Sequence, residues 1–405
     1  MIVAIIGGGA AGFFSAITVK ENFPNANVAI FEKTNNLLSK VKVSGGGRCN
    51  VTNGCTSIKK LSEAYPRGGN SLKKAFRIFN TIHAIQWFES RGVPLVIQDD
   101  NCVFPVSQSS QSVMDCFFKE SSRLGINIEV DKGIKAIQQF DSKLKLFFID
   151  TKVEPKIFDR VIVATGGSPK REELEWLEKL HHKIEDPFPS LFTFNMPDEP
   201  IKKLMGVVVE NALVSIQGTK IKADGPLLIT HWGMSGPAIL KLSSLGARLL
   251  SEKEYEFKLQ VNWVNTRNND LVMDRLQSIV DDHANKILSN FRPYSLSERL
   301  WLYLLEKSGL SLNKKWRELG KSGMNKLVNI LTNDVYSVKG KTSFRDEFVT
   351  CGGISLDSID FTTMQSKVCK NLYFAGELMD IDGITGGYNF QAAWTTAFIA
   401  GKLMP

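Results

Sequence analysis

The sequence opens with Met1-Ile-Val-Ala-Ile-Ile-Gly-Gly-Gly-Ala-Ala-Gly12, a continuous apolar run followed by closely spaced glycines. Such a run is typical of a strand that is buried on both faces of a parallel sheet. Residues 10–23 then carry apolar side chains at helical spacing up to Pro24, and residues 28–31 form a second apolar run. This order predicts a β-α-β unit with parallel strands and a right-handed crossover.

The glycines of this unit form a G-x-G-x-x-G motif at Gly7, Gly9 and Gly12. The first glycine permits a tight turn, the second lets the backbone approach a pyrophosphate, and the third allows close helix–strand packing. The positive end of the helix favours the phosphates. Glu32 ends the second strand, where a carboxylate accepts hydrogen bonds from ribose hydroxyls. We interpret the unit as a dinucleotide-binding site, with a structural glycine turn as the alternative.

Two further glycine-rich segments follow, Val43–Asn50 and Gly376–Asn389, and the second of them precedes the last predicted helix. Their main-chain amides could approach a second, larger part of a cofactor. Three separated glycine clusters therefore favour FAD over NAD, unless they are unrelated surface turns.

Three segments carry a family resemblance. They are Ser44-Gly-Gly-Gly-Arg-Cys-Asn-Val-Thr-Asn53, Thr230-His-Trp-Gly-Met-Ser-Gly-Pro-Ala238 and Phe374-Ala-Gly-Glu-Leu-Met-Asp-Ile-Asp-Gly-Ile-Thr-Gly-Gly-Tyr-Asn389. They resemble the signature segments of the bacterial aminoacetone oxidase family of FAD-binding enzymes, also described as NAD(P)/FAD-dependent oxidoreductases. This group includes flavoproteins implicated in bile-acid dehydroxylation. The resemblance spans nearly the whole chain, but residues 264–333 contain no recognisable motif.

The resemblance implies an α/β fold: a discontinuous, glutathione-reductase-like FAD-binding Rossmann domain with an inserted β-barrel and a helical subdomain. The expected partition assigns 1–187 and 346–405 to the FAD domain, 188–263 and 334–345 to the β-barrel-like insert, and 264–333 to the helical subdomain. Periodicity predicts helices at 73–91, 110–124 and 297–307 and a last helix that ends near 403. It predicts strands at 158–164, 191–195, 206–217, 227–230, 254–263 and 335–338.

The resemblance also implies roles for individual residues. The ADP half of FAD would be bound by Gly7, Gly9, Ala10, Ala11, Gly12 and Glu32. Residues that flank the cofactor and active site would be Lys42, Ser44, Gly45, Arg48, Cys49 and Asn50, and Thr165 and Gly166 would close over the adenosine. The ribityl and isoalloxazine would be held by Gly376, Glu377, Gly386, Gly387, Tyr388 and Asn389. The predicted cofactor-binding set also includes Lys33, Ile134 and Ala164.

Three side chains are candidates for chemistry. His231 could donate a proton to a substrate, since its pKa lies near neutrality, or it could be a histidine bonded to backbone in a structural turn. Cys49 lies beside Arg48, which would favour a thiolate, yet we interpret it as a small packing residue near FAD. Arg48 could hold an anionic substrate or a cofactor phosphate, or form a surface ion pair.

The six cysteines include no Cys-x-x-Cys pair, which argues against a zinc ribbon, a local redox dithiol and a disulfide framework. Asp380-Ile-Asp382-Gly383 lacks the remainder of a calcium loop, so no metal is predicted. His181 and His182 are expected at the surface. No secretory signal or membrane span is evident, and a cytoplasmic location is expected.

The net charge is +8, and residues 262–345 hold 14 Lys and Arg against 8 Asp and Glu. Because these cations are dispersed through helical sequence, we interpret them as a solvated surface and do not expect a nucleic-acid partner or a membrane partner. The sequence leaves the oligomeric state open.

The function predicted is an FAD-dependent oxidoreductase that passes hydride to a small organic substrate. Only one strand-flanked G-x-G-x-x-G is present, so NAD(P)H would dock transiently as electron donor. The alternatives are an amine-type oxidase, an FAD-containing RNA-modification protein and a non-catalytic sensor. The Thr230–Pro237 loop is expected at the mouth of the site, opposite Arg48–Asn50 and Gly386–Asn389.

Overall fold

The computed structural model describes residues 1–342 and 349–404. These residues fall into two compact units, one of residues 1–190 with 349–404 and one of residues 191–342. The sequence places the first division three residues earlier, at 187/188. The predicted boundary at 345/346 lies outside the described residues, and the division of the second unit into barrel and helical parts stays a prediction.

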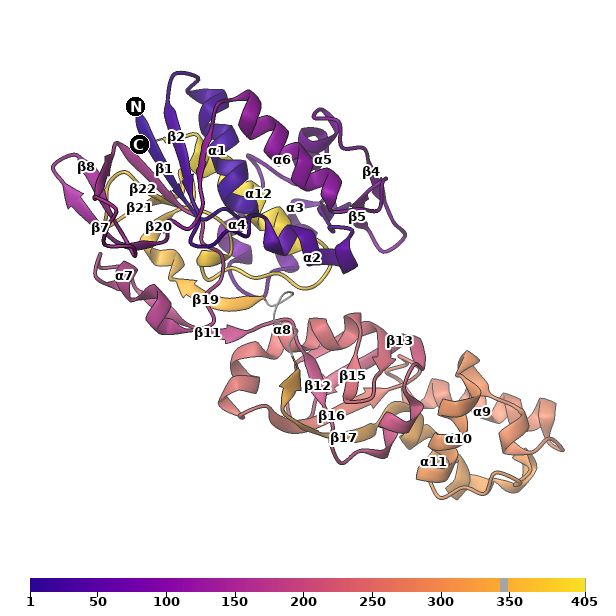
Figure 1. Ribbon diagram of the computed structural model, residues 1–405. Coiled ribbons are helices and arrows are strands. Elements are labelled where there is room, and N and C mark those ends of the chain that lie inside the picture. The colour runs from indigo at the N-terminus through magenta and orange to yellow at the C-terminus, as the bar shows by residue number, and fades with distance from the viewer. Residues whose placement is uncertain (343–348, 405) are drawn as a thin grey trace. The chain divides into compact units, whose positions relative to one another are not determined.

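The first unit is built on the predicted β-α-β unit (Figure 1). Strands β1 (Ile2–Ile6) and β2 (Asn27–Phe31) are parallel, and α1 (Ala10–Asn22) connects them. The full sheet has the order β20-β21-β22-β10-β1-β2-β6, whose five strands from β22 to β6 are parallel. The remaining bounds are β6 (Asn127–Glu129), β10 (Arg160–Val163), β20 (Ile359–Asp360), β21 (Gln365–Ser366) and β22 (Leu372–Phe374).

Helices cover this sheet, and packing against it and against one another removes their apolar faces from water. α1 is buried from Ala11 to Val19 and contacts both α6 (Gln111–Arg123) and α12 (Tyr388–Gly401). Aromatic rings fill the space between these helices, among them Phe14, Phe117 and Trp394. The other helices of the unit are α2 (Ser39–Gly47), α3 (Ile58–Glu63), α4 (Gly69–Ala75), α5 (Thr81–Glu89) and α7 (Glu175–Glu178).

Three small antiparallel sheets complete the first unit: β3-β5-β4, β7-β8-β9 and β11-β19. Their bounds are β3 (Thr52–Asn53), β4 (Leu95–Ile97), β5 (Cys102–Pro105), β7 (Ile134–Phe140), β8 (Lys143–Phe148), β9 (Lys156–Phe158), β11 (Ile184–Pro189) and β19 (Thr350–Ile354).

Two predicted elements of this unit were wrong in their extent. The helix predicted at 73–91 is two helices, because the Asn80 side chain accepts hydrogen bonds from the backbone of Ile82 and His83 and so starts α5 afresh. The strand predicted at 158–164 is divided at Asp159. Its first part, β9, pairs with β8, whereas β10 pairs with β1 and β22.

The second unit holds a seven-stranded antiparallel sheet of order β17-β16-β13-β14-β15-β12-β18. Its two end strands are separated only by Gly340, whose N–H bonds to Tyr255 O and whose carbonyl accepts from Asn195 N. The sheet therefore closes on itself as a small barrel. The bounds are β12 (Thr193–Asn195), β13 (Val208–Ile216), β14 (Lys222–Ile229), β15 (Gly233–Ser235), β16 (Glu256–Asn262), β17 (Asp334–Lys339) and β18 (Lys341–Thr342).

A long helix of this unit, α8 (Pro237–Glu252), was not predicted from the sequence. Pro237 stands at its first position, where the missing N–H costs nothing, and its buried residues pack against β13 and β14. The helical sequence that follows forms α9 (Asn269–His283), α10 (Glu298–Lys307) and α11 (Gly320–Thr332). None of the helices in the described ranges is both long and apolar enough to span a bilayer.

Candidate active site

The G-x-G-x-x-G turn has the geometry that a dinucleotide needs. Gly7 has a φ of 111°, and a Cβ there would lie 2.4 Å from Ala164 O. A Cβ at Gly12 would lie 1.9 Å from Gly7 O. At Gly9, by contrast, a Cβ would meet nothing within 4 Å. The first two glycines are required by the protein itself, whereas Gly9 leaves open space at the start of α1, where no side chain caps the helix.

Glu32 lies at the end of β2, beside this turn. Its Oε2 accepts a hydrogen bond from Gly8 N at 2.8 Å, and its Oε1 accepts from the backbone and hydroxyl of Thr34, both at 3.1 Å. The carboxylate is thus held in place next to the uncapped helix. A Cβ added at Gly133, the residue before Ile134, would lie 3.2 Å from the Cβ of Lys33, so the backbone before Ile134 passes close to Lys33.

The second glycine segment is the end of α2, where Gly45, Gly46 and Gly47 all have positive φ. Arg48 follows, with its guanidinium 4.0 Å from the centroid of the Phe104 ring and its Nε donating to Gly45 O. Within the described residues, Arg48 forms no ion pair. Its charge therefore remains unneutralised, which argues against the surface ion pair considered above.

Cys49 packs as a small buried residue, as interpreted above, and its inclusion in the cofactor-binding set stays a prediction. Its side chain is 0% exposed. Burial raises the pKa of its thiol to about 12, which disfavours the thiolate that a nucleophile requires. Cys49 packs in the core beneath the glycine segment.

The third glycine segment packs directly on the second. A Cβ at Gly387 would lie 2.2 Å from Thr52 O and 2.8 Å from Asn50 Oδ1, and Asn53 Nδ2 donates to Gly386 O at 2.9 Å. Gly387 also has a φ of 84° and begins α12 without a side-chain cap. Asn389 bonds through its amide to both backbone groups of Gly383. The fold thus unites segments that are more than 300 residues apart in the sequence.

Gly376 and Glu377 bring the same segment to the first glycine turn. A Cβ at Gly376 would lie 2.9 Å from the Cβ of Ala11. Glu377 accepts from Thr350 N at 2.9 Å and pairs with Lys40 at 2.6 Å. Lys40 was not among the predicted site residues. The predicted Lys42, two residues on, has an exposed side chain, and Thr165 is exposed beside the buried Ala164.

The turn between α3 and α4 holds the loop that precedes α12. Arg67 forms a two-pronged ion pair with Asp382, which also accepts from the Ser190 hydroxyl. Tyr65 donates to Tyr388 O at 2.6 Å, and Ile384 N donates to Ala64 O at 2.9 Å. These contacts position the glycine loop, and the sequence carries no local signal for them because the partners lie between 192 and 323 residues apart.

His231 lies in the second unit, on an exposed turn. The turn is held by Thr230, whose N–H and Oγ1 bond to Gly233, and by Trp232, whose Nε1 donates to Thr193 Oγ1. His231 itself only packs edge-on against the Trp232 ring, at 4.4 Å between centroids. No hydrogen bond joins it to any described residue, so the turn does not need this imidazole.

The prediction that His182 lies at the surface was wrong. Its side chain is buried, with Nε2 2.8 Å from the Ser366 hydroxyl and Nδ1 3.2 Å from Leu177 O. The sequence was misleading because the neighbouring Glu175, Lys179 and His181 are all exposed. Burial lowers the pKa of His182, so the fold favours its neutral form.

These features together define a flavoprotein of the glutathione-reductase-like class. The parallel sheet has a first turn that leaves room at Gly9, the helix that follows begins without a side-chain cap, and an acidic residue follows the second strand. Two more glycine loops lie beside them. The residues present fit FAD. The chain belongs to the HI0933-like protein Rossmann domain family, whose model matches residues 1–403.

Three characterised proteins are similar to it over nearly their whole length. A 3-dehydro-bile acid delta(4,6)-reductase of Clostridium scindens is 26% identical over 99% of this chain and 98% of its own length. A ribosomal RNA dihydrouridine synthase of Escherichia coli is 26% identical over 98% of this chain and 96% of its own. The synthase of the same name from Haemophilus influenzae is 25% identical over 97% and 96%. The protein is an FAD-dependent oxidoreductase.

Proposed function

We propose that this enzyme is a reductase that saturates a carbon–carbon double bond conjugated with a carbonyl group, using electrons from NAD(P)H. One observation carries the proposal: full-length relatives named for different substrates share one chemistry. In a 3-dehydro bile acid the Δ4 bond is conjugated with the 3-oxo group. In uridine the bond that becomes saturated in dihydrouridine is conjugated with the base carbonyl. Both reactions add hydride to one carbon and a proton to the other.

FAD, when bound, supplies the hydride chemistry, and the chain supplies orientation and electrostatics. Gly9 and the start of α1 would hold the pyrophosphate, Glu32 the adenosine ribose, and Gly386–Asn389 the isoalloxazine end. The described residues include a single sheet with a glycine turn of this kind. NAD(P)H would therefore dock transiently at the site rather than occupy a domain of its own.

The chain's own part in the proton transfer would fall to His231. A general acid must be able to reach the substrate and be free of structural duties; His231 is exposed to solvent and has no hydrogen bond to a described residue, which supports this proposal. The adjoining Thr230 and Trp232 fix the turn, so the imidazole would be presented by a rigid support. Arg48 would hold an anionic group or the carbonyl of the substrate, since its charge is not neutralised by a carboxylate.

Anaerobic mixing of the holoenzyme with NADH or NADPH tests this proposal. Rapid bleaching of the flavin by either donor is expected, followed by reoxidation on addition of an α,β-unsaturated ketone and formation of the saturated product. Bleaching by a primary amine but by neither nicotinamide would replace the reductase with an amine-type oxidase. Bleaching by none of these donors would favour a non-catalytic sensor.

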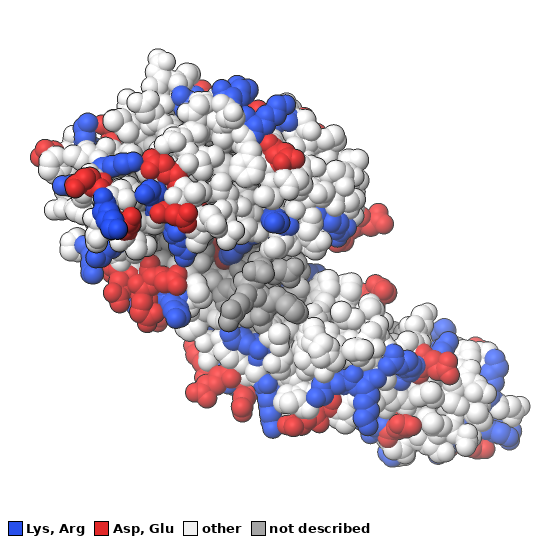
Figure 2. Space-filling view, in the orientation of Figure 1, with Lys and Arg blue, Asp and Glu red and all other residues white. Residues whose placement is uncertain are grey.

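A uracil base within RNA is the second candidate substrate. The observation that favours it is the excess of 14 cations over 8 anions in residues 262–345. Figure 2 shows Lys and Arg side chains in a band across one face of the second unit, with fewer Asp and Glu among them. A polyanion is attracted to such a surface. Incubation of reduced enzyme with RNA, followed by nucleoside analysis for dihydrouridine, separates this candidate from a small-molecule reductase.

A further inference from the structure

Helix α11 presents two faces of opposite character. Its buried face packs in the core of the second unit and includes Met324, Leu327 and Leu331. Its exposed face carries only long or polar side chains, at the spacing that puts them on one side of a helix. These residues, which we call the α11 face, are Lys321, Ser322, Asn325, Lys326 and Asn329.

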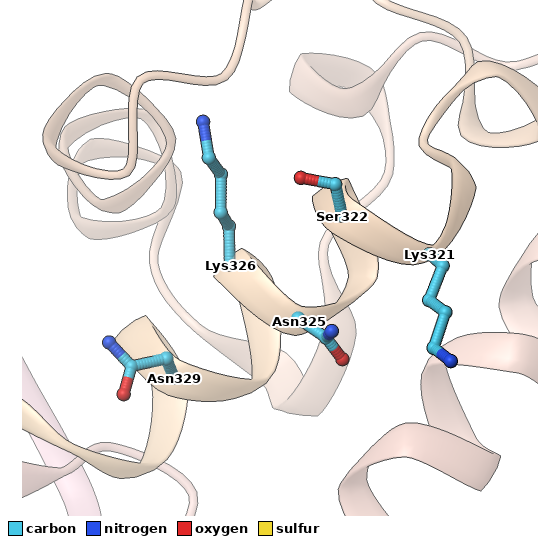
Figure 3. Close-up of a pocket in the computed structure, with 5 residues that line it drawn as sticks. All are labelled: Lys321, Ser322, Asn325, Lys326 and Asn329. Atoms are coloured by element: carbon cyan, nitrogen blue, oxygen red, sulfur yellow. The ribbon is translucent and has the colours of Figure 1, made fainter.

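The α11 face lines a hollow of about 590 Å³ on the surface (Figure 3). In that view the Lys326 side chain extends upward from the helix and the Lys321 side chain extends downward, so the two cations lie at opposite edges of the α11 face. The hollow thus has a cation on each flank and amide and hydroxyl groups between. Asn and Ser can both donate and accept hydrogen bonds, whereas the lysines only donate.

The charges on this face are not used within the protein. Helix α11 has no acidic residue, and neither Lys321 nor Lys326 forms an ion pair with any carboxylate that the structure describes. The sequence from 310 to 332 holds five Lys and Arg and one acidic residue, Glu318. A helix face with unpaired cations attracts anionic partners from outside the chain, and it repels cationic ones.

We propose that the α11 face binds the sugar–phosphate backbone of RNA. Lysines on flexible stems neutralise phosphates without fixing their orientation, and Asn and Ser side chains are common ligands of phosphate and sugar oxygens. The donor and acceptor capacity of Asn325 and Asn329 also suits the 2′-hydroxyl, which donates and accepts. A small anion is disfavoured as occupant, because the face is exposed and no buried donors converge on one point. The proposal rests on the second candidate substrate above and names the surface that would deliver it.

The test uses the FAD-loaded enzyme and a fluorescein-labelled hairpin RNA, with anisotropy recorded over a range of KCl concentrations. The variant is Lys321→Glu/Lys326→Glu. Each phosphate contact contributes about 0.7–0.9 to the slope of log K against log salt, so loss of two should lower the slope by roughly 1.4–1.8. The milder Lys321→Gln/Lys326→Gln should give the same loss of slope without charge reversal, which covers the case in which the Glu variant misfolds.

The matched control is Lys220→Glu/Lys222→Glu, which makes the same change in net charge at two exposed lysines near the turn between β13 and β14 of the same unit. It should leave the slope unchanged. Equal weakening by both double variants would overturn the proposal, because net charge alone would then explain binding. Absence of RNA binding by the wild type at low salt would also overturn the proposal. Displacement of the labelled RNA by an acidic peptide, but not by unlabelled RNA, would overturn it as well.

The same variants should bleach with NADPH at the wild-type rate, since the α11 face takes no part in holding the flavin. If RNA binding depends on the α11 face but no dihydrouridine forms, the docking surface stands and the uracil-reductase candidate fails. If dihydrouridine forms while the variants bind RNA normally, the function stands and the α11 face is the wrong surface.

Discussion

The two units each bury a carboxylate against a cation, but with different surroundings. In the first unit Asp382 pairs with Arg67 in the loop between Glu377 and α12, next to glycines with positive φ. In the second unit Asp334 begins the regular strand β17 and accepts from Lys307 at 2.5 Å, from Trp263 Nε1 at 2.9 Å and from the Tyr336 hydroxyl. Both side chains are almost completely buried.

A buried ion pair by itself indicates neither high stability nor a functional site, because the cost of removing both charges from water cancels much of their attraction. The backbone around the pair is what differs. Arg67 and Asp382 hold an irregular loop that has to accommodate a ligand, whereas Lys307 reaches from the surface of α10 to the buried Asp334 at the start of a regular strand. Damage to the first unit should therefore appear in cofactor binding, and damage to the second in stability.

The largest effect should come from Gly9→Val. The space beyond Gly9 is empty of protein atoms, so the fold should tolerate the side chain, but a pyrophosphate could no longer approach. The purified variant should lack flavin absorbance and take up no FAD. Its far-UV circular dichroism and melting temperature should match those of wild-type apoprotein. A yellow Gly9→Val protein would remove the basis for placing FAD at this turn.

Asp334→Ala should destabilise the protein by about 2–5 kcal/mol, because each buried donor that loses its acceptor costs about 1–3 kcal/mol. Trp263 and Tyr336 would lose their acceptor, and both are buried. Urea unfolding followed by tryptophan fluorescence measures the change. Asp198→Ala breaks the exposed Lys339–Asp198 pair and should cost less than about 1 kcal/mol. If the Asp334→Ala protein lost FAD but kept its free energy of unfolding, the assignment of cofactor binding to the first unit's pair and of stability to the second unit's pair would be wrong.

His231→Ala should slow turnover about 10²-fold with FAD content unchanged, the typical size of a lost acid–base group. His283→Ala, which removes another histidine of the second unit, serves as the control. Wild-type turnover by His231→Ala would withdraw the proposed acid and leave the assignment of the cofactor untouched.

Arg67→Gln should weaken FAD binding by about tenfold, or 1.4 kcal/mol, because glutamine can still donate a hydrogen bond to Asp382 but removes the positive charge that faces this buried carboxylate. The dissociation constant from flavin fluorescence titration is the readout. Arg123→Gln removes an exposed guanidinium paired with Glu120 and should leave FAD affinity unchanged. An effect of Arg67→Gln on stability alone would make the Arg67–Asp382 pair equivalent to the pair in the second unit.

The smallest effect concerns pH. Burial lowers the pKa of His182 below its usual value of about 6.5. Its contribution to stability is therefore complete above that value and is lost as the pH falls toward the lower pKa of the folded state. Unfolding free energies measured across this window should decline with falling pH in the wild type and decline less in His182→Asn. His181→Gln should reduce this decline less than His182→Asn does, since the exposed His181 acts on His182 only through its charge.

Local patterns were enough to predict the flavin domain. The apolar run before Gly7, the glycine spacing and Glu32 all act within a few residues of one another, so the sequence specifies the β-α-β unit and its ligand. The helix predicted at 73–91 was wrong in its extent for a local reason as well. Asn80 caps a new helix by side-chain hydrogen bonds, which periodicity does not reveal.

Long-range pairing decided the rest. The contact of Gly387 with Thr52, the Lys40–Glu377 pair and the Arg67–Asp382 pair each join residues more than 300 positions apart, and nothing near either partner signals the other. The closure of the barrel through Gly340 and the burial of His182 likewise depend on which strand lies alongside. A sequence records the preferences of each short segment, whereas burial, ion pairing and charge compensation depend on neighbours that only the folded chain provides.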